Sequence, residues 1–268
     1  MRILIRTSKW AIWSRRIASF ALPLAIVPIF MHRGGMITSE TFNVIEWTAI
    51  FCALAALVMA ISSFVRLWIT GDRGWVRAAF GVVFSLIVLL PAAYAAYAFW
   101  TYPRTTDVYT DLADPPLLVS DVPHVQMTTD LARSIAAAFP NVASRTYPLG
   151  PEQVFELALA LAAARGWEVE ARLAPQGPAG EGQLNAIVVT LLGWRDEISV
   201  RVTGVPEGST VAMRSSSQVG IHDLGENGHR IEEFLLALDT EVTVIMRDAP
   251  LNAPVEPAEG EEETEDAA

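Results

Sequence analysis

The sequence contains a single cysteine, Cys52, which lies inside a long apolar run. One cysteine excludes a disulfide within the chain, and the cysteine usage therefore does not indicate a redox compartment. Buried in an apolar run, Cys52 is most simply a small hydrophobic side chain.

Basic residues are scarce in the second part of the chain. Beyond Arg104 there are nine basic and 27 acidic residues, whereas up to Arg104 there are ten basic and three acidic residues. Binding to nucleic acid phosphates needs a basic face, so this balance argues against nucleic acid as a partner of the distal part. The basic first part is better explained by membrane topology.

Charge is also missing from two long apolar runs, residues 47–65 and 78–102, each long enough to cross a bilayer core. The apolar run 17–31 is shorter and contains two prolines, so its length alone fits a signal sequence, a re-entrant segment or a kinked span. No small-residue cleavage site follows it, which favours an uncleaved first span. We predict a transmembrane region over residues 1–102, with spans at about 15–33, 45–69 and 76–101.

The short flanks of these spans predict the orientation. Five basic residues precede the first span, three surround the turn between the second and third spans, and only Arg33 lies in the first loop. The positive-inside rule places the N-terminus and the second loop in the cytoplasm. Three spans then export the C-terminal domain.

Residues 103–146 are rich in proline, aspartate and threonine without a sustained period, which predicts an extended linker. A short helix over 131–139 would end at Pro140. At the other end of the chain, residues 249–268 contain mainly alanine, proline and glutamate, and are predicted to form a disordered acidic tail.

Residues 147–248 show regular patterns of an α+β domain. A helix begins at Gly150-Pro151 and ends at Gly166. Strands are predicted at 167–173, 184–192, 196–203 and 210–215, with one face of the first strand buried. In the third strand, Ile198, Val200 and Val202 should point inward, and Glu197, Ser199 and Arg201 outward. The predicted fold is a bundle of three transmembrane helices followed by a small α+β domain, a four-stranded antiparallel meander flanked by two helices.

The stretch 214–231, RSSSQVGIHDLGENGHRI, connects the last strand to the long second helix. Asp223 is a favoured N-cap residue, and Glu226 three positions later completes a capping box, so the helix should begin at Asp223. From Ile231 to Ile245, apolar residues recur at three- and four-residue spacing, which gives one stripe for packing on a sheet.

The exported part resembles an uncharacterised bacterial family known as domain of unknown function 1499. Three landmarks carry this resemblance over roughly residues 109–238: TDLADPP at 110–116, RDEISVRV at 195–202, and the stretch 214–231. The resemblance implies association with a bacterial envelope or membrane and no established activity. With the orientation above, it implies an inner-membrane protein with a periplasmic domain. Glu197 and Asn185 depart from the family pattern, which weakens any acidic metal cluster.

Two chemical hypotheses involve the stretch 214–231. His222, Asp223 and the serines at 215–217 have the residue types of a hydrolase, but neighbours on an extended segment point to opposite faces and no nucleophile elbow is present. A metal site from His222, His229, Asp223 and Glu226 lacks a recognised ligand spacing. We therefore predict no catalytic residue, no metal ligand and no cofactor.

The same stretch could bind an anion, because the N–H groups of a helix N-terminus attract negative charge. The predicted ligand-binding residues are Arg214, Gly220, His222, Asp223, Asn227 and Arg230, and Arg201 could complete such a pocket. The sequence favours a second interpretation over the anion pocket, in which Arg230 pairs with Glu226 or Glu233 on its own helix and Asn227 hydrogen-bonds a loop. The predicted partners are the lipid bilayer, a lipid and other membrane proteins, without nucleic acid. The sequence thus favours a membrane-anchored periplasmic binding or envelope-organising module over the alternative, a membrane-tethered hydrolase using His222 and Asp223.

Overall fold

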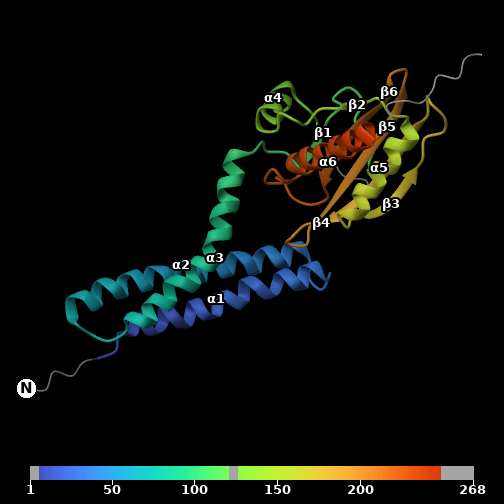
Figure 1. Cartoon of the computed structure of the whole chain (residues 1–268). Coiled ribbons are helices and arrows are strands. Elements are labelled where there is room, and N and C mark those ends of the chain that lie inside the picture. The colour runs from blue at the N-terminus through green and yellow to red at the C-terminus, as the bar shows by residue number, and fades with distance from the viewer. Residues whose placement is uncertain (1–5, 121–125, 249–268) are drawn as a thin grey trace, which may run out of the picture.

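Three long apolar helices open the chain in the computed structural model, which describes residues 6–120 and 126–248 (Figure 1). They are α1 (Lys9–Arg33), α2 (Ser39–Thr70) and α3 (Trp75–Thr101), and each is long and apolar enough to cross a membrane. The predicted spans fall within these three helices. Their length and composition suit a membrane anchor.

Small side chains bring the three helices close together. Alanine and serine recur on the buried faces of α1 and α2, and Ser14 donates a hydrogen bond to the carbonyl of Ala56 at 3.0 Å. Gly81 on α3 packs directly against Ser14, where a Cβ atom would overlap the hydroxyl. Such residues let helix backbones approach closely where no hydrophobic effect drives association. In its second half, which follows Pro91, α3 turns away from α1 and α2 toward the C-terminal domain (Figure 1).

The C-terminal domain contains an antiparallel sheet of six strands within the described residues, in the order β1-β6-β5-β4-β3, with β2 also pairing to β6. The strands are β1 (Asp107–Tyr109), β2 (Arg145–Tyr147), β3 (Glu168–Leu173), β4 (Glu181–Val189), β5 (Arg195–Val205) and β6 (Gly208–Ser217). The α+β class is confirmed, but the prediction of four strands is wrong. β1 lies in the predicted linker and β2 at the boundary between this linker and the predicted domain, and three residues are too few to show an alternating pattern.

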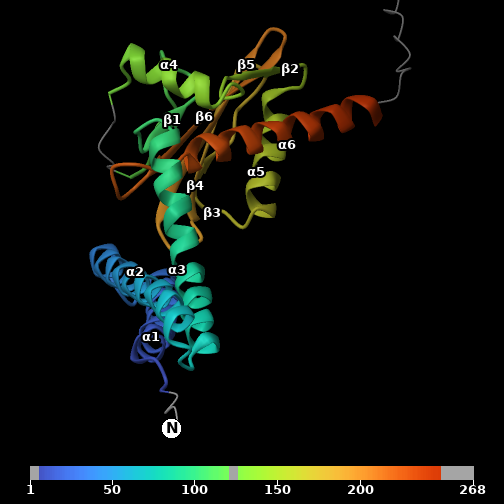
Figure 2. The same cartoon turned by 90° about the vertical axis from the view of Figure 1, so that its left-hand side faces the viewer.

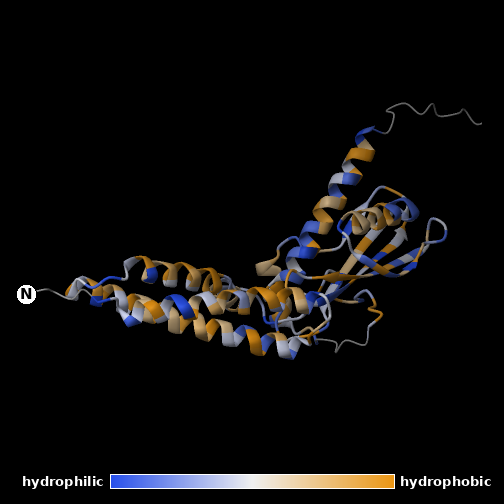
Figure 3. Ribbon diagram, turned by 90° about the horizontal axis from the view of Figure 1, so that it is seen from below, coloured by the Kyte–Doolittle hydropathy of each residue, from blue (hydrophilic) through white to orange (hydrophobic). Residues whose placement is uncertain are grey.

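Helices α5 (Pro151–Ala164) and α6 (Glu226–Asp248) cover one face of this sheet, and α4 (Thr129–Ala138) lies near its β1 edge (Figure 2). The core lies between the sheet and these helices. As predicted, Ile198, Val200 and Val202 are buried there. The apolar stripe of α6 meets them through Ile231, Phe234, Leu235, Leu238 and Val242. The last turns of α6 project beyond the sheet (Figure 3).

The opposite face of the sheet does not face water as predicted. Glu197 and Ser199 are fully buried, because the segment 110–120 lies across this face. The first strand of the predicted meander, β3, shows the reverse error: all six of its residues are exposed. It is the edge strand, and the side-chain alternation of a sequence does not reveal which strand lies at an edge. The predicted acidic tail, 249–268, lies outside the described residues.

Candidate functional site

Asp223 lies in the connection between β6 and α6, and its carboxylate accepts hydrogen bonds from two backbone N–H groups. Its Oδ1 accepts from Gly225 and its Oδ2 from Asn227, both at 3.0 Å. The helix nevertheless begins at Glu226, not at Asp223, because Leu224 and Gly225 have φ angles of 57° and 88°. Backbone in this left-handed region cannot belong to a right-handed helix. The predicted capping box also fails, since the Asp223 N–H donates to the carbonyl of Thr105.

Asn227 is fully buried and joins three elements at this junction. Its Nδ2 donates to the Thr106 carbonyl and to the Ser217 hydroxyl, both at 3.0 Å. Its Oδ1 accepts from the Ser215 hydroxyl and from Nη1 of Arg230, both at 2.7 Å. Every donor and acceptor position of the amide is thus used. Asn227 therefore fixes the start of α6 to β6 and to the chain entering β1.

Arg230 pairs most closely with a residue on the sheet, and the predicted pair with Glu226 of its own helix is present as a longer contact. Its Nη2 lies 2.7 Å from Oδ2 of Asp196, the second residue of β5, and its Nη1 donates to the Ser215 hydroxyl at 2.9 Å. Glu226 reaches only 4.0 Å and is largely exposed. Removing two charges from water is offset only when the charges lie close together and make further hydrogen bonds, and the Arg230–Asp196 pair meets both conditions.

Arg214 lies on the face of the sheet opposite to its neighbour Ser215, since side chains of adjacent strand residues point in opposite directions. Its Nε and Nη2 donate to the two carboxylate oxygens of Asp107 at 2.9 and 2.7 Å. Arg201, on the same face, donates to Asp111 and Asp114. The structure therefore does not bring Arg201, Arg214 and Arg230 together, and it gives each of these arginines a carboxylate partner.

A second polar cluster on that face was missed from the sequence. Glu197 accepts from the N–H groups of Val119 and Ser120 at 2.5 and 3.0 Å and also from the Ser120 hydroxyl. Asn185 donates to Glu197 at 3.3 Å and to the carbonyl of Leu117 at 2.9 Å. Together with the bonds from Arg201 to Asp111 and Asp114, these contacts place the segment 110–120 against the landmark 195–202. Charged residues at alternate positions of a predicted strand were the available signal.

His222 is buried, with only 3% of its side chain exposed. Its Nδ1 accepts the Leu224 N–H at 2.8 Å, and its ring lies 4.9 Å from the ring of Phe99 at the end of α3. Nε2 has no hydrogen-bond partner among the described residues. Because Ser215 and Ser217 both bond to Asn227, neither hydroxyl is aligned on His222. The geometry of a nucleophile, base and acid is not assembled here.

Burial also determines the charge behaviour of Asp223. Desolvation raises the pKa of its carboxyl above the ordinary value, and the two N–H bonds from Gly225 and Asn227 lower it part of the way back. Among the described residues, no group of three or more histidine, cysteine, aspartate or glutamate side chains is arranged to hold a metal ion.

The domain contacts the three apolar N-terminal helices at two places. At the end of α3, the ring of Tyr102 stacks on Phe139 and fits against Gly225, where a Cβ atom would lie 2.7 Å from the ring. At the connection between α1 and α2, Nδ1 of His32 lies 2.7 Å from the carbonyl oxygen of Leu192, in the turn between β4 and β5. The Trp194 ring of the same turn packs edge-on against His32. The junction at 214–231 therefore lies at the end of the domain that faces the helices.

The loop between β6 and α6 exposes apolar side chains at this end. Ile221 is 86% exposed and Val219 more than half exposed. Gly220 between them has a φ of 110°, which the absence of a side chain permits. The loop is held at its two ends, where Gln218 donates to the Arg195 carbonyl and Asp223 to the Thr105 carbonyl.

Comparison with known proteins gives a family and two solved structures. A family model described as protein of unknown function (DUF1499) matches residues 107–238. No curated protein matches the chain. The Thermus thermophilus protein TTHA0849 is 18% identical, with 38% of this chain and 95% of that chain covered and a TM-score of 0.22. A Rhodobacter sphaeroides structural genomics target is 15% identical, with 35% and 88% covered and a TM-score of 0.15. At such scores neither likeness supports an inference about this chain.

Proposed function

We propose that this chain, which belongs through residues 107–238 to the family of unknown function DUF1499, is a membrane-anchored binding module. Because the family has no known function, the role must come from the geometry of the chain itself. We propose that the module contacts lipid through the turn at 214–231. We place it in a bacterial inner membrane, with the N-terminus in the cytoplasm and the domain in the periplasm. The basic flanks of the spans support this orientation. A thiol introduced by Gly177→Cys in a Cys52→Ala chain tests it, because a reagent added outside the inner membrane should label it without lysis.

The surroundings of the turn support a position at the membrane surface. His222 of the turn packs on Phe99, and the neighbouring Trp100 is exposed near the end of α3. The guanidinium carbon of Arg104 lies 5.0 Å from the Phe99 ring centre and 5.7 Å from that of Trp100. Tryptophan and arginine at the end of an apolar helix are typical of the lipid headgroup level. The turn would therefore lie at that level.

Ile221 carries the proposal, because it is an isoleucine exposed to 86% beside the end of a membrane helix. Residues 218–221, QVGI, contain no charged side chain that would have to leave water. Immersing an isoleucine side chain in the acyl boundary stabilises the contact by about 1.5–3 kcal/mol. The buried network of Asn227, Arg230 and Asp196 then has a clear role, since it fixes the base of the loop.

The alternatives at this turn have less support. An anion bound by Arg214 and Arg230 would have to displace Asp107 and Asp196 from short, buried ion pairs. A hydrolase would need His222 to face a hydroxyl, whereas its Nδ1 accepts a backbone N–H and its ring packs on Phe99. Polar side chains here position the loop, and its apolar side chains are the ones left exposed.

The test is the depth of a probe at position 221. Ile221→Cys in a Cys52→Ala chain is labelled with an environment-sensitive fluorophore in lipid nanodiscs that contain nitroxide lipids. Leu173→Cys is the matched control, because Leu173 is 63% exposed at the opposite end of the sheet. We expect blue-shifted, nitroxide-quenched emission at 221 and neither effect at 173. Equal, water-like emission at both positions would exclude lipid contact by the turn.

A further inference from the structure

A cavity of about 420 Å³ lies where the end of α1 meets the domain. Three segments line it: Arg33 at the end of α1, Arg165 to Glu168 between α5 and β3, and the last two residues of β4. None of these residues belongs to the turn at 214–231. The cavity is therefore a separate feature of the contact between the domain and the membrane helices.

Its two arginines differ from most other arginines of the domain. Arg201, Arg214 and Arg230 each have a carboxylate within about 3 Å, whereas neither Arg33 nor Arg165 forms an ion pair among the described residues. Two positive charges thus lie unneutralised in a chain with a net charge of −11. Such charges are available for an anion.

The guanidinium groups of both arginines are held in place by neutral acceptors. Nη1 of Arg33 donates to the carbonyls of Thr190 and Leu191, the latter at 3.2 Å. Arg165 donates to the carbonyls of Leu161 and Glu233 at 3.4 and 3.3 Å, and its guanidinium carbon lies 5.3 Å from the ring centre of Phe234. These contacts restrict the guanidinium groups without cancelling their charge. The N–H donors of a guanidinium group held in this way match the geometry of the oxygens of a phosphate.

Glu168 is the one acidic residue of the lining, against two arginines, and it pairs with an arginine outside the cavity. Its Oε2 lies 3.3 Å from Nη2 of Arg195, which is also 3.9 Å from Glu170. The lining therefore keeps an excess of positive charge. Trp167, stacked on Phe234 with ring centres 5.1 Å apart, adds a partly apolar wall.

We propose that this cavity binds a phosphate group, supplied by a phospholipid headgroup or by free phosphate. Arg33 is the last residue of an apolar helix long enough to span, so the cavity would lie at the level of the headgroups. The proposal deepens the proposed function and rests on it for this placement. It depends on different residues, however, so the two can fail separately.

Native mass spectrometry of the full chain tests the proposal. Detergent micelles are supplemented with phosphatidylglycerol or with diacylglycerol, which lacks the phosphate. We expect retained phosphatidylglycerol, and about tenfold weaker retention for Arg33→Gln and for Arg165→Gln, since each loses a charge-assisted contact. Arg165→Lys, which keeps the charge but loses the fork, should fall between. Arg172→Gln is the control, because Arg172 is exposed on β3, outside the cavity, and should leave retention unchanged.

Inorganic phosphate provides the second arm. Displacement of the lipid by millimolar phosphate would show that the phosphate group alone is recognised, and no displacement would show that the lipid is the source. Equal retention of both lipids, or equal loss in Arg172→Gln, would overturn the proposal. If the probe at position 221 is immersed in lipid while the arginine variants retain lipid normally, only the proposal of a phosphate site in the cavity is wrong. If lipid retention depends on the arginines while the probe at position 221 is exposed to water, only the proposal of lipid contact by the turn is wrong.

Discussion

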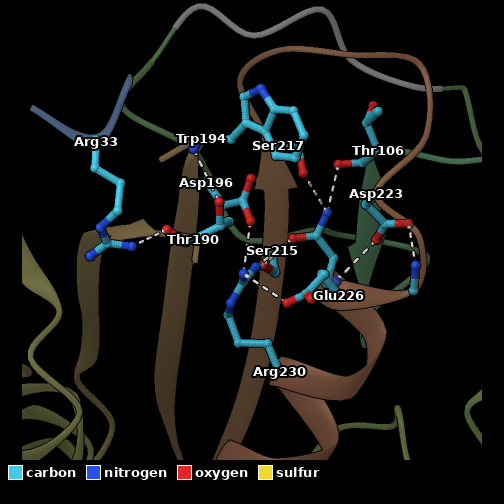
Figure 4. Close-up of polar contacts among 12 residues, drawn as sticks. Arg33, Thr106, Thr190, Trp194, Asp196, Ser215, Ser217, Asp223, Glu226 and Arg230 are labelled. Atoms are coloured by element: carbon cyan, nitrogen blue, oxygen red, sulfur yellow. Dashed lines mark hydrogen bonds and ion pairs between the residues drawn. The ribbon is translucent and has the colours of Figure 1, made fainter. Parts of the chain in front are cut away.

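Arg230 and Asp196 face each other at 2.7 Å between the second turn of α6 and the start of β5, and both side chains are almost fully buried (Figure 4). This pair joins elements 34 residues apart, at the point where the exposed loop 218–222 returns to the helix. The charge pair in the core therefore supports the loop in addition to the loop's own contacts at Gln218 and His222.

Arg230→Gln should destabilise the fold by about 3–5 kcal/mol, because it leaves the carboxylate of Asp196 buried without its partner. Urea unfolding of the full chain in detergent, followed by circular dichroism, measures this change. Arg133→Gln is the matched control, since Arg133 pairs with Asp130 at the surface and such pairs contribute about 0–1 kcal/mol. Equal effects of the two substitutions would show that the buried pair has no special role.

Asp223 should make the stability of the protein fall as the pH rises. Burial raises the pKa of its carboxyl above 3.8, so the folded state binds the proton more tightly than the unfolded state. The stability that this group contributes is fully present below the unfolded pKa and is lost as the pH rises through the higher folded value. We expect the stability of the native chain, relative to Asp223→Asn, to decrease as the pH rises above about 4.

Unfolding of both proteins across this range provides the comparison, and Asp223→Asn serves as the reference because its amide does not titrate. A stability difference that grew with pH would mean that the two N–H bonds to the carboxylate outweigh its desolvation.

Sequence reasoning predicted the elements with strong periodicity and missed those fixed by distant contacts. The three apolar helices, the four strands of the meander and the stripe of α6 were visible because each repeats over many residues. Strand β1 was not, because Asp107 to Tyr109 is held by β6 and by the Asp107–Arg214 pair, more than a hundred residues away. Local propensity contains no signal for such a partner.

The candidate site shows the same limit. Asp223 and Glu226 were recognised as helix-start residues, but the helix begins three residues after Asp223, since the positive φ angles of Leu224 and Gly225 are not specified by a capping pattern. Treating the arginines at 201, 214 and 230 as one group ignored the alternation of strand side chains, which places Arg214 and Ser215 on opposite faces. No pattern in the sequence indicated that the His222 side chain is buried, and only the path of α3 explains its burial against Phe99.

Gly193→Ala should weaken the packing of the β4–β5 turn against the end of α1. Gly193 has a φ of 95°, and a Cβ atom there would lie 2.8 Å from the backbone nitrogen of Arg33. Gly177→Ala is the control, because its φ of 74° carries a similar backbone cost with no neighbour within 4 Å. Hydrogen–deuterium exchange should be faster around residues 190–194 in Gly193→Ala alone. Equal exchange in the two variants would mean that the turn does not depend on this contact.

Glu197→Gln should release the segment 110–120 from the sheet. The new amide places a donor where the carboxylate now accepts N–H groups of Val119 and Ser120, and each unsatisfied buried group costs about 1–3 kcal/mol. Limited proteolysis within 110–120 should accelerate. Glu181→Gln, a change at an exposed glutamate at the start of β4, should leave the cleavage rate unchanged. Resistance of Glu197→Gln to the protease would show that other contacts hold the segment.

Photo-crosslinking of the unmodified full chain measures whether the turn at 214–231 contacts lipid. Nanodiscs containing a phospholipid with a photoreactive group at the headgroup level are irradiated, and the labelled peptides are identified by mass spectrometry. We predict adducts at Val219 and Ile221, in addition to those on α1, α2 and α3. Adducts confined to the three helices, with none on residues 218–222, would contradict the account.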